Sequence, residues 1–122
     1  MTATLQGTRL DLTDDVRRRV AATLAAALRP LGGDTSAVHA AVEVERTSRG
    51  LHRAEVTLSL GRATLRAEAT AATLREALGD VRQTLARQVR EWRARRRDAQ
   101  RAAPPVPPET GDPAWWDATE GA

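Results

Sequence analysis

Arginine is the residue type whose number and spacing in this sequence point most directly to a chemistry. All 19 basic residues are Arg, because Lys is absent. Eight of them fall between positions 82 and 101, where only two acidic residues occur, so this segment carries a net charge of +6. A planar guanidinium group contacts phosphate through two parallel hydrogen bonds and stacks on nucleobases. The pattern therefore favours a partner that is rich in phosphate.

Catalytic and metal-binding chemistry has few residues to use. Cys is absent, which excludes a disulfide framework, a zinc–thiolate site and a thiol nucleophile. The only histidines, His39 and His52, lack a third ligand or an orienting partner in the pattern, and we interpret them as surface residues of strands. No nucleophile–base pair and no phosphate-binding glycine loop is visible. We therefore predict a protein that is not an enzyme and uses no cofactor, metal or small-molecule substrate.

The elements that must position the arginines begin with a short strand, expected at residues 4–7. Thr13, followed by two acidic residues, is a favourable helix start. Apolar residues then recur at helical spacing as far as Leu31. Pro30 and the glycine pair at 32–33 are expected to end this helix.

Three segments that follow alternate between apolar and polar residues, namely 38–45, 53–60 and 63–70. This period of two is typical of strands with one buried face. Gly61-Arg62 predicts a tight hairpin turn between the last two strands, and residues 46–51 form a longer loop between the first two.

The longest predicted element is a helix from about Thr73 to about Arg101. Its start, Thr73-Leu74-Arg75-Glu76, has the capping-box pattern. Apolar residues follow at steps of four and three as far as Trp92. The order β-α-β-β-β-α indicates an α+β fold, in which two helices pack on one face of a four-stranded sheet.

One flank of this last helix is expected to be cationic. With Arg82 placed at zero, the apolar residues fall between about 260° and 340° and six arginines between about 0° and 100°. Arg95 and Arg96 fall where apolar residues would continue, so the last turns are expected to project beyond the sheet. A phosphate-binding ridge is favoured over the alternative, a solvated helix end. The six residues are Arg75, Arg82, Arg90, Arg93, Arg97 and Arg101.

Other arginines could extend this ridge. Arg17–Arg19 lie on the first helix, and Arg46, Arg49 and Arg53 lie in or after the loop between strands. We take Arg17 and Arg49 as the candidates from these two groups. The predicted outer face of the sheet carries mixed charges and no aromatic residues, which excludes an RNA-recognition motif that stacks bases on its sheet.

Residues 104–122 differ in composition from the rest of the chain. They begin with a proline-rich segment and carry a net charge of −4, against +7 for residues 1–103. We expect one domain at 1–103 and a disordered acidic tail at 104–122. The pair Trp115-Trp116 in this tail could dock on the domain, bind a partner or stack on RNA. Trp92 is expected to cap the core stripe of the last helix, with stacking on a base as the alternative.

Several segments together resemble one known family. The strongest is Leu85-Ala86-Arg87-Gln88, which a basic segment follows, and residues 65–69 and Leu12-Thr13 also fit. In order and spacing, residues 4–98 resemble the short ribosome hibernation factors, the family of the ribosome-associated inhibitor and the hibernation-promoting factor. By this resemblance Arg87 is an RNA contact, and Arg93 and Arg95 occupy basic positions of the family.

The resemblance implies a domain that binds the small ribosomal subunit and its 16S rRNA in the channel for mRNA and tRNA. Such a domain would silence or protect ribosomes in stress or stationary phase. Nineteen tail residues are too few for the dimerisation domain of the longer family members, so the chain is not expected to join ribosomes into dimers by that route. We also expect a monomer away from the ribosome. Two alternatives stay open: a protein that binds another structured RNA, and an adaptor that binds proteins through the Trp-Trp tail.

The sequence also bears on where the protein acts. No apolar run approaches the roughly 18 residues that a membrane-spanning helix needs. The first 11 residues lack the basic and then apolar pattern of a secretory signal. We therefore expect a cytoplasmic protein without a membrane partner.

Overall fold

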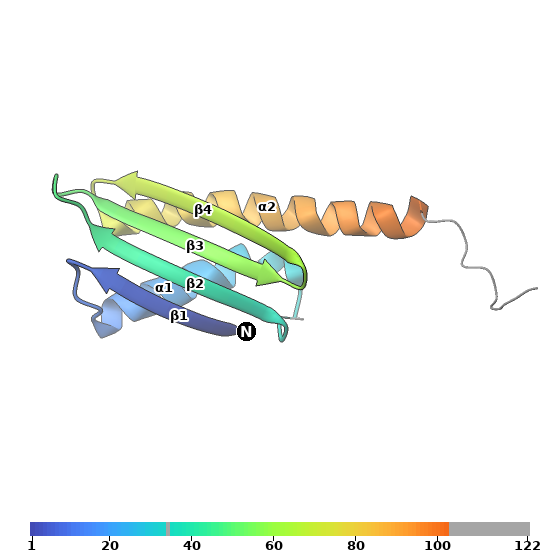
Figure 1. Cartoon of the computed structure of the whole chain (residues 1–122), viewed down its shortest axis with the longest axis horizontal. Helices are drawn as coiled ribbons and strands as arrows, with labels where there is room; N and C mark the ends of the chain where they lie inside the picture. The colour runs from blue at the N-terminus through green and yellow to red at the C-terminus, as the bar shows by residue number, and fades with distance from the viewer. Residues whose placement is uncertain (34, 103–122) are drawn as a thin grey trace, which may run out of the picture.

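The structure is a computed structural model, and it describes residues 1–33 and 35–102. The elements are β1 (Thr2–Thr8), α1 (Asp14–Ala27), the 3-10 helix η1 (Arg29–Leu31), β2 (Val38–Arg46), β3 (His52–Leu60), β4 (Ala63–Ala71) and α2 (Leu74–Ala102). Figure 1 shows the four strands side by side with both helices behind them. The predicted α+β fold with the order β-α-β-β-β-α is confirmed.

The strands form one sheet in the order β1-β2-β3-β4. β1 runs parallel to β2, as the intervening helix α1 requires, and the other neighbours are antiparallel. Leu60 pairs with Ala63, so the hairpin between β3 and β4 has the predicted two-residue turn Gly61-Arg62. Gly61 has φ +62°, the left-handed conformation that this kind of turn favours.

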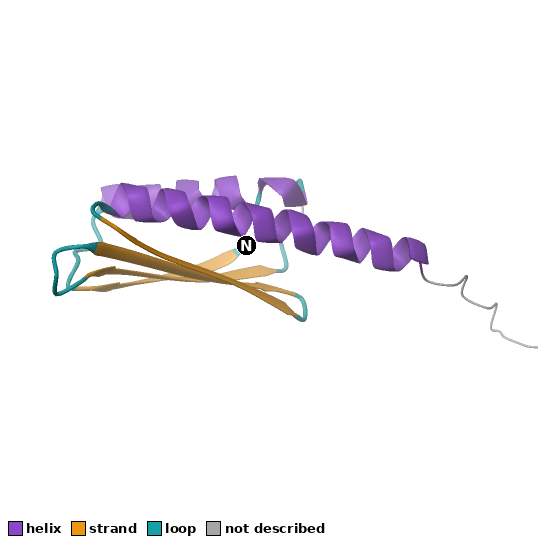
Figure 2. Ribbon diagram, turned by 90° about the horizontal axis from the view of Figure 1, so that it is seen from above, coloured by secondary structure: helices purple, strands orange, loops and turns teal. Residues whose placement is uncertain are grey.

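The core lies between the sheet and the two helices, which cover the same face (Figure 2). Alternate residues of β2 and β3 point into it, so Val44, Ala54 and Leu58 are fully buried. Leu24 of α1 and Leu85 of α2 meet them from the helix layer. Most of these side chains are small or aliphatic, because the chain has no Phe, Tyr or Ile with which to fill a larger space.

Two element boundaries differ from the sequence-based expectation. β1 spans Thr2–Thr8 and not only 4–7, because every one of its residues is in register with β2 although only Leu5 is half-buried. α1 begins after Thr13, whose Oγ1 accepts a hydrogen bond from the Val16 amide as predicted. It ends at Ala27 and not near Leu31, since Pro30 lies in the separate 3-10 turn.

Glycine is required at position 7 because the segment around Leu10 and Leu12 passes close to its Cα atom. A Cβ atom built at this position would lie 2.8 Å from the carbonyl oxygen of Leu10 and 2.8 Å from the Leu12 side chain. Such distances are shorter than van der Waals contact, so only glycine fits without a shift of the backbone. The turn after β1 thereby directs the chain toward the start of α1.

α2 is longer than the sheet that it covers. Its buried residues end at Val89, Trp92 is half-buried, and Arg95–Arg101 are exposed. Figure 2 shows the last turns running past the β3–β4 hairpin without a strand beneath them. The predicted projection of the helix end into solvent is confirmed.

Candidate nucleic-acid interface

The rotation of α2 about its axis is set at its first turn. The Thr73 amide donates a hydrogen bond to the Glu76 carboxylate (3.2 Å), and the Glu76 amide donates to Thr73 Oγ1 (3.1 Å). This is the reciprocal capping box that the sequence predicts. From this start Leu78, Val81 and Leu85 point into the core. The arginines at other angles of the helix consequently face solvent.

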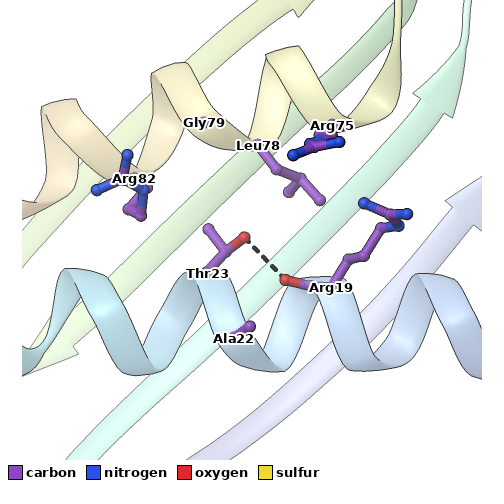
Figure 3. A pocket seen from close by; sticks show the side chains of 7 residues that line it. All are labelled: Arg19, Ala22, Thr23, Arg75, Leu78, Gly79 and Arg82. Carbon is purple, nitrogen blue, oxygen red and sulfur yellow. Dashed lines mark hydrogen bonds between the residues drawn. The ribbon is translucent and has the colours of Figure 1, made fainter.

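Three arginines from the two helices meet at a groove between them. Arg19 of α1 faces Arg75 and Arg82 of α2 across an open groove of about 330 Å³ (Figure 3). The remaining lining residues are small or apolar, and none is acidic. Three guanidinium groups around an open groove suit the oxygen atoms of a phosphate backbone.

The three guanidinium groups are not equally available. Arg19 donates a hydrogen bond from Nε to Asp15 Oδ2 at 2.8 Å, and this bond lowers the pKa of the Asp15 carboxyl group. Within residues 1–33 and 35–102, Arg75 and Arg82 form no ion pair. The α2 side of the groove therefore carries the free positive charge.

Arg17 is the α1 candidate that the sequence predicts, but Arg19 is the α1 arginine that lines the groove. Two positions along a helix differ by about 200°, so these residues lie on nearly opposite sides of α1. Arg17 is exposed but does not line the groove. Which α1 arginine lines the groove depends on the angle at which α1 packs against α2. The sequence pattern does not give that angle.

The rest of the predicted ridge continues along α2 toward its free end. Arg90 and Arg97 are exposed and unpaired among the described residues, whereas Arg101 forms an ion pair with Asp98. Arg93 donates a hydrogen bond to the Pro30 carbonyl oxygen of η1. Arg93 thus joins α2 to the segment after α1, so it has a structural contact as well as a charge.

Arg87 and Arg95, the positions suggested by family resemblance, extend the positive charge to other sides of α2. Gln88 donates a hydrogen bond to the Arg66 carbonyl oxygen of β4 at 3.1 Å, so the side of α2 that carries Gln88 lies against the edge of the sheet. Arg95 lies beside the β3–β4 hairpin with Arg62. Arg87 is exposed. α2 is therefore cationic on both flanks.

Arg49 lies at the end of the sheet where α2 begins. Its loop, residues 47–51, closes on Thr47, whose Oγ1 accepts hydrogen bonds from the amides of Arg49 (3.3 Å) and Leu51 (3.1 Å). Arg49 is exposed. Its loop, between β2 and β3, lies at the end of the sheet away from the projecting end of α2 (Figure 1). The structure does not bring Arg49 together with Arg90 and Arg97.

Arg53 does not extend the cationic surface, contrary to the expectation that it could. It lies on the outer face of the sheet, where it contacts four carboxylates at 2.6–3.5 Å. These hydrogen bonds, led by the one to Glu45, raise the pKa of Arg53. The four partners are Glu43, Glu45, Glu55 and Glu68.

The ion pairs of Arg53 offset a repulsion between glutamates that the strand register places opposite one another. Glu43 is directly opposite Glu55, and Glu55 is directly opposite Glu68, so three like charges form a row across β2, β3 and β4. Such cross-strand pairs are destabilising when they are not neutralised. Arg53 and Arg66 are the cations that neutralise this row; a hydrogen bond from Arg66 lowers the pKa of Glu55, and Arg53 adds to this effect. The outer face of β2–β4 carries four glutamates and two arginines, so it is acidic overall, opposite in sign to α2.

The two histidines do not form a site. His39 is in register with Ser59 and His52 with Ala71, which places them toward opposite ends of the sheet. A ring nitrogen of His52 lies 3.2 Å from the Ala72 carbonyl oxygen. In the part of the chain that the structure describes, no cluster of His, Asp and Glu suits a metal ion, and no helix is long and apolar enough to cross a membrane.

The predicted acidic tail at 104–122, with Trp115 and Trp116, lies outside the described residues. The three roles considered for the Trp-Trp pair therefore stay predictions.

Comparisons with known proteins agree with this architecture. The family of the sigma 54 modulation protein and S30EA ribosomal protein matches residues 3–97. The N-terminal domain of Protein Y from Thermus thermophilus is similar with a TM-score of 0.65 and 27% identity, over 75% of this chain and 99% of that one. A ribosomal subunit interface protein from Coxiella burnetii has the same fold, with a TM-score of 0.64 and 13% identity over 77% and 99% of the two chains. Among curated protein sequences, none matches the chain.

Proposed function

Because the chain belongs to the sigma 54 modulation protein / S30EA ribosomal protein family, we propose that it binds the small ribosomal subunit through 16S rRNA. The observation that carries this proposal is the arginine surface of α2, to which Arg19 of α1 contributes across the groove. On α2 this surface consists of the exposed residues Arg75, Arg82, Arg90 and Arg97. Phosphate contacts of this kind give strong binding with little sequence preference. The Thermus thermophilus and Coxiella burnetii proteins are described as Protein Y and as a ribosomal subunit interface protein.

The proposed mechanism is occupancy. A rigid domain, with a helix of 29 residues that projects beyond its sheet, would lie in the channel of the small subunit and exclude mRNA and tRNA. Translation would then be silenced, and idle ribosomes protected, during stress or stationary phase. No chemical step is needed, and the protein would act in the cytoplasm as a monomer. Its domain would be residues 1–103, followed by the acidic tail at 104–122.

Sedimentation with purified subunits tests this function. At low salt the protein should move with the small subunit, and a large excess of bulk transfer RNA should not displace it. At high salt it should stay at the top of the gradient, because counterions then compete for the phosphates. Failure to sediment with the small subunit at low salt would contradict the proposal. Ready displacement by transfer RNA would favour the alternative of a general binder of structured RNA.

A further inference from the structure

A hollow lies where α2 leaves the sheet, distinct from the groove between the helices. It has a volume of about 670 Å³. One wall is α2, with Trp92, Arg95 and Arg96, and the other is the hairpin between β3 and β4. The hairpin residues are Leu60, Gly61, Arg62 and Ala63.

Trp92 provides the aromatic surface of this hollow. Its position ends the apolar seam of α2, so one part of the indole packs against the core and the rest stays accessible. The Arg96 guanidinium carbon lies 5.4 Å from the ring centroid, within the range of a cation–π contact. An aromatic ring and a neighbouring guanidinium plane are the two surfaces on which proteins stack unpaired bases.

The surroundings of Trp92 are strongly cationic. Three of the seven lining residues are arginines and none is acidic. No ion pair engages Arg62, Arg95 or Arg96 within residues 1–33 and 35–102. The tight Gly61-Arg62 turn holds Arg62 exposed at the rim, on the opposite wall from Arg95. Three unneutralised cations around an apolar floor fit a planar group that carries a phosphate.

We propose that this hollow binds one unpaired nucleotide of an RNA, with its phosphate held by Arg62 and Arg95 and its base stacked on Trp92 in the place that the Arg96 guanidinium occupies in the free protein. This inference rests on the proposed function, since it specifies which part of a bound RNA this end of the domain contacts. The groove between the helices has only apolar and small residues besides its arginines and holds no aromatic ring. The backbone-binding groove and the base-binding hollow thus lie on the same helix, with different ligand chemistry.

Trp92 fluorescence gives a direct test on the full chain. The background variant is Trp115→Phe with Trp116→Phe, which leaves Trp92 as the only tryptophan. Titration with a ten-residue uridine oligonucleotide should quench its emission in a saturable way, because a stacked base quenches indole. An abasic oligonucleotide of the same length and charge should bind more weakly and leave the emission unchanged. Equal affinity for both oligonucleotides, or no quenching at saturation, would overturn the proposal.

Substitutions separate stacking from structural support. Trp92→Leu should lower affinity for the uridine oligonucleotide about 10-fold, whereas Trp92→Phe, which keeps an aromatic ring, should stay within about threefold of the starting affinity. Urea unfolding of both variants shows whether the core end is intact. If Trp92→Phe loses as much affinity as Trp92→Leu with unchanged stability, stacking is not the cause and the proposal fails.

The proposed function and this inference can fail independently. If the protein sediments with the small subunit but binding leaves Trp92 emission unchanged, the hollow proposal is wrong and the ribosome proposal stands. If the uridine oligonucleotide quenches Trp92 but the protein does not sediment with the small subunit, the hollow binds RNA and the ribosome assignment is wrong.

Discussion

Replacing Arg82, Arg90 and Arg97 together with glutamate is expected to weaken binding to the small subunit by at least about 1,000-fold. Each guanidinium–phosphate contact is a charge-assisted hydrogen bond worth about 1.5–3 kcal/mol. Loss of three such contacts alone gives a decrease of this size, and the new carboxylates add repulsion from the phosphates. The three positions are exposed and form no ion pair among the described residues, so folding should not depend on them. Arg93 is left in place because of its contact with Pro30.

A matched control separates the arginine surface from total charge. Arg9, Arg46 and Arg49 are also exposed, and they lie at the end of the sheet away from the projecting turns of α2. Their replacement by glutamate shifts the formal net charge from +3 to −3, as the first triple substitution does. Sedimentation should show loss of binding for the α2 variant and at most about a tenfold decrease for the control. Equal losses would mean that net charge, and not the α2 surface, determines binding.

Substitution of Arg53 by methionine is expected to lower the free energy of unfolding by about 2 kcal/mol, the usual scale for hydrogen bonds to charged groups. The Arg53 side chain is 21% exposed and contacts four carboxylates. Without it, Glu43, Glu55 and Glu68 remain opposite one another with only Arg66 to neutralise them. Arg66→Met is the comparison variant: Arg66 is 68% exposed and, among the described residues, pairs only with Glu55, which is 13% exposed, so we expect a smaller loss than for Arg53, which contacts four carboxylates. Urea unfolding at neutral pH measures both.

The Arg53 effect should depend on pH in a defined direction. In the native protein the pKa of Glu55 is lowered, first by its hydrogen bond with Arg66 and also by its hydrogen bond with Arg53. Its contribution to stability is therefore present above the unfolded-state pKa, near 4.3 for a glutamate, and is lost as pH falls through the folded-state pKa. In Arg53→Met the carboxylates repel one another, and acid relieves that repulsion. The difference in stability between the two proteins should shrink below about pH 4. A difference that is independent of pH would contradict the electrostatic explanation.

Much of the fold follows from local patterns that the sequence shows directly. The caps at Thr13 and Thr73 were predicted from residue spacing alone, and their hydrogen bonds are present. The two-residue turn at Gly61 was likewise predicted, because glycine there signals a backbone with positive φ. The element ends depend on more than local pattern. β1 extends to Thr2 because β2 offers it partners, a non-local effect.

The site was predicted less completely than the fold. A helical wheel assigns Arg82 and Arg90 to one flank, because both lie on a single helix whose core side is evident. It cannot decide between Arg17 and Arg19, since that choice depends on how α1 packs against α2. Arg53 resembles the other arginines in sequence, and only the cross-strand register shows that its four neighbours are glutamates. The alternation of polar and apolar residues at 53–60 indicates that the Arg53 side chain points outward, but it does not show which residues it contacts.

Directed cleavage of ribosomal RNA tests most directly whether the arginine side of α2 faces the small subunit. The chain has no cysteine, so a single cysteine can carry an iron chelate that cleaves nearby RNA. Gln83→Cys places it among the α2 arginines, and Ala41→Cys places it on the acidic outer face of the sheet; both positions are exposed. We expect strong cuts in 16S rRNA from position 83 and few from position 41. Cuts mainly from position 41, or none from either while the protein is bound, would contradict this placement of α2.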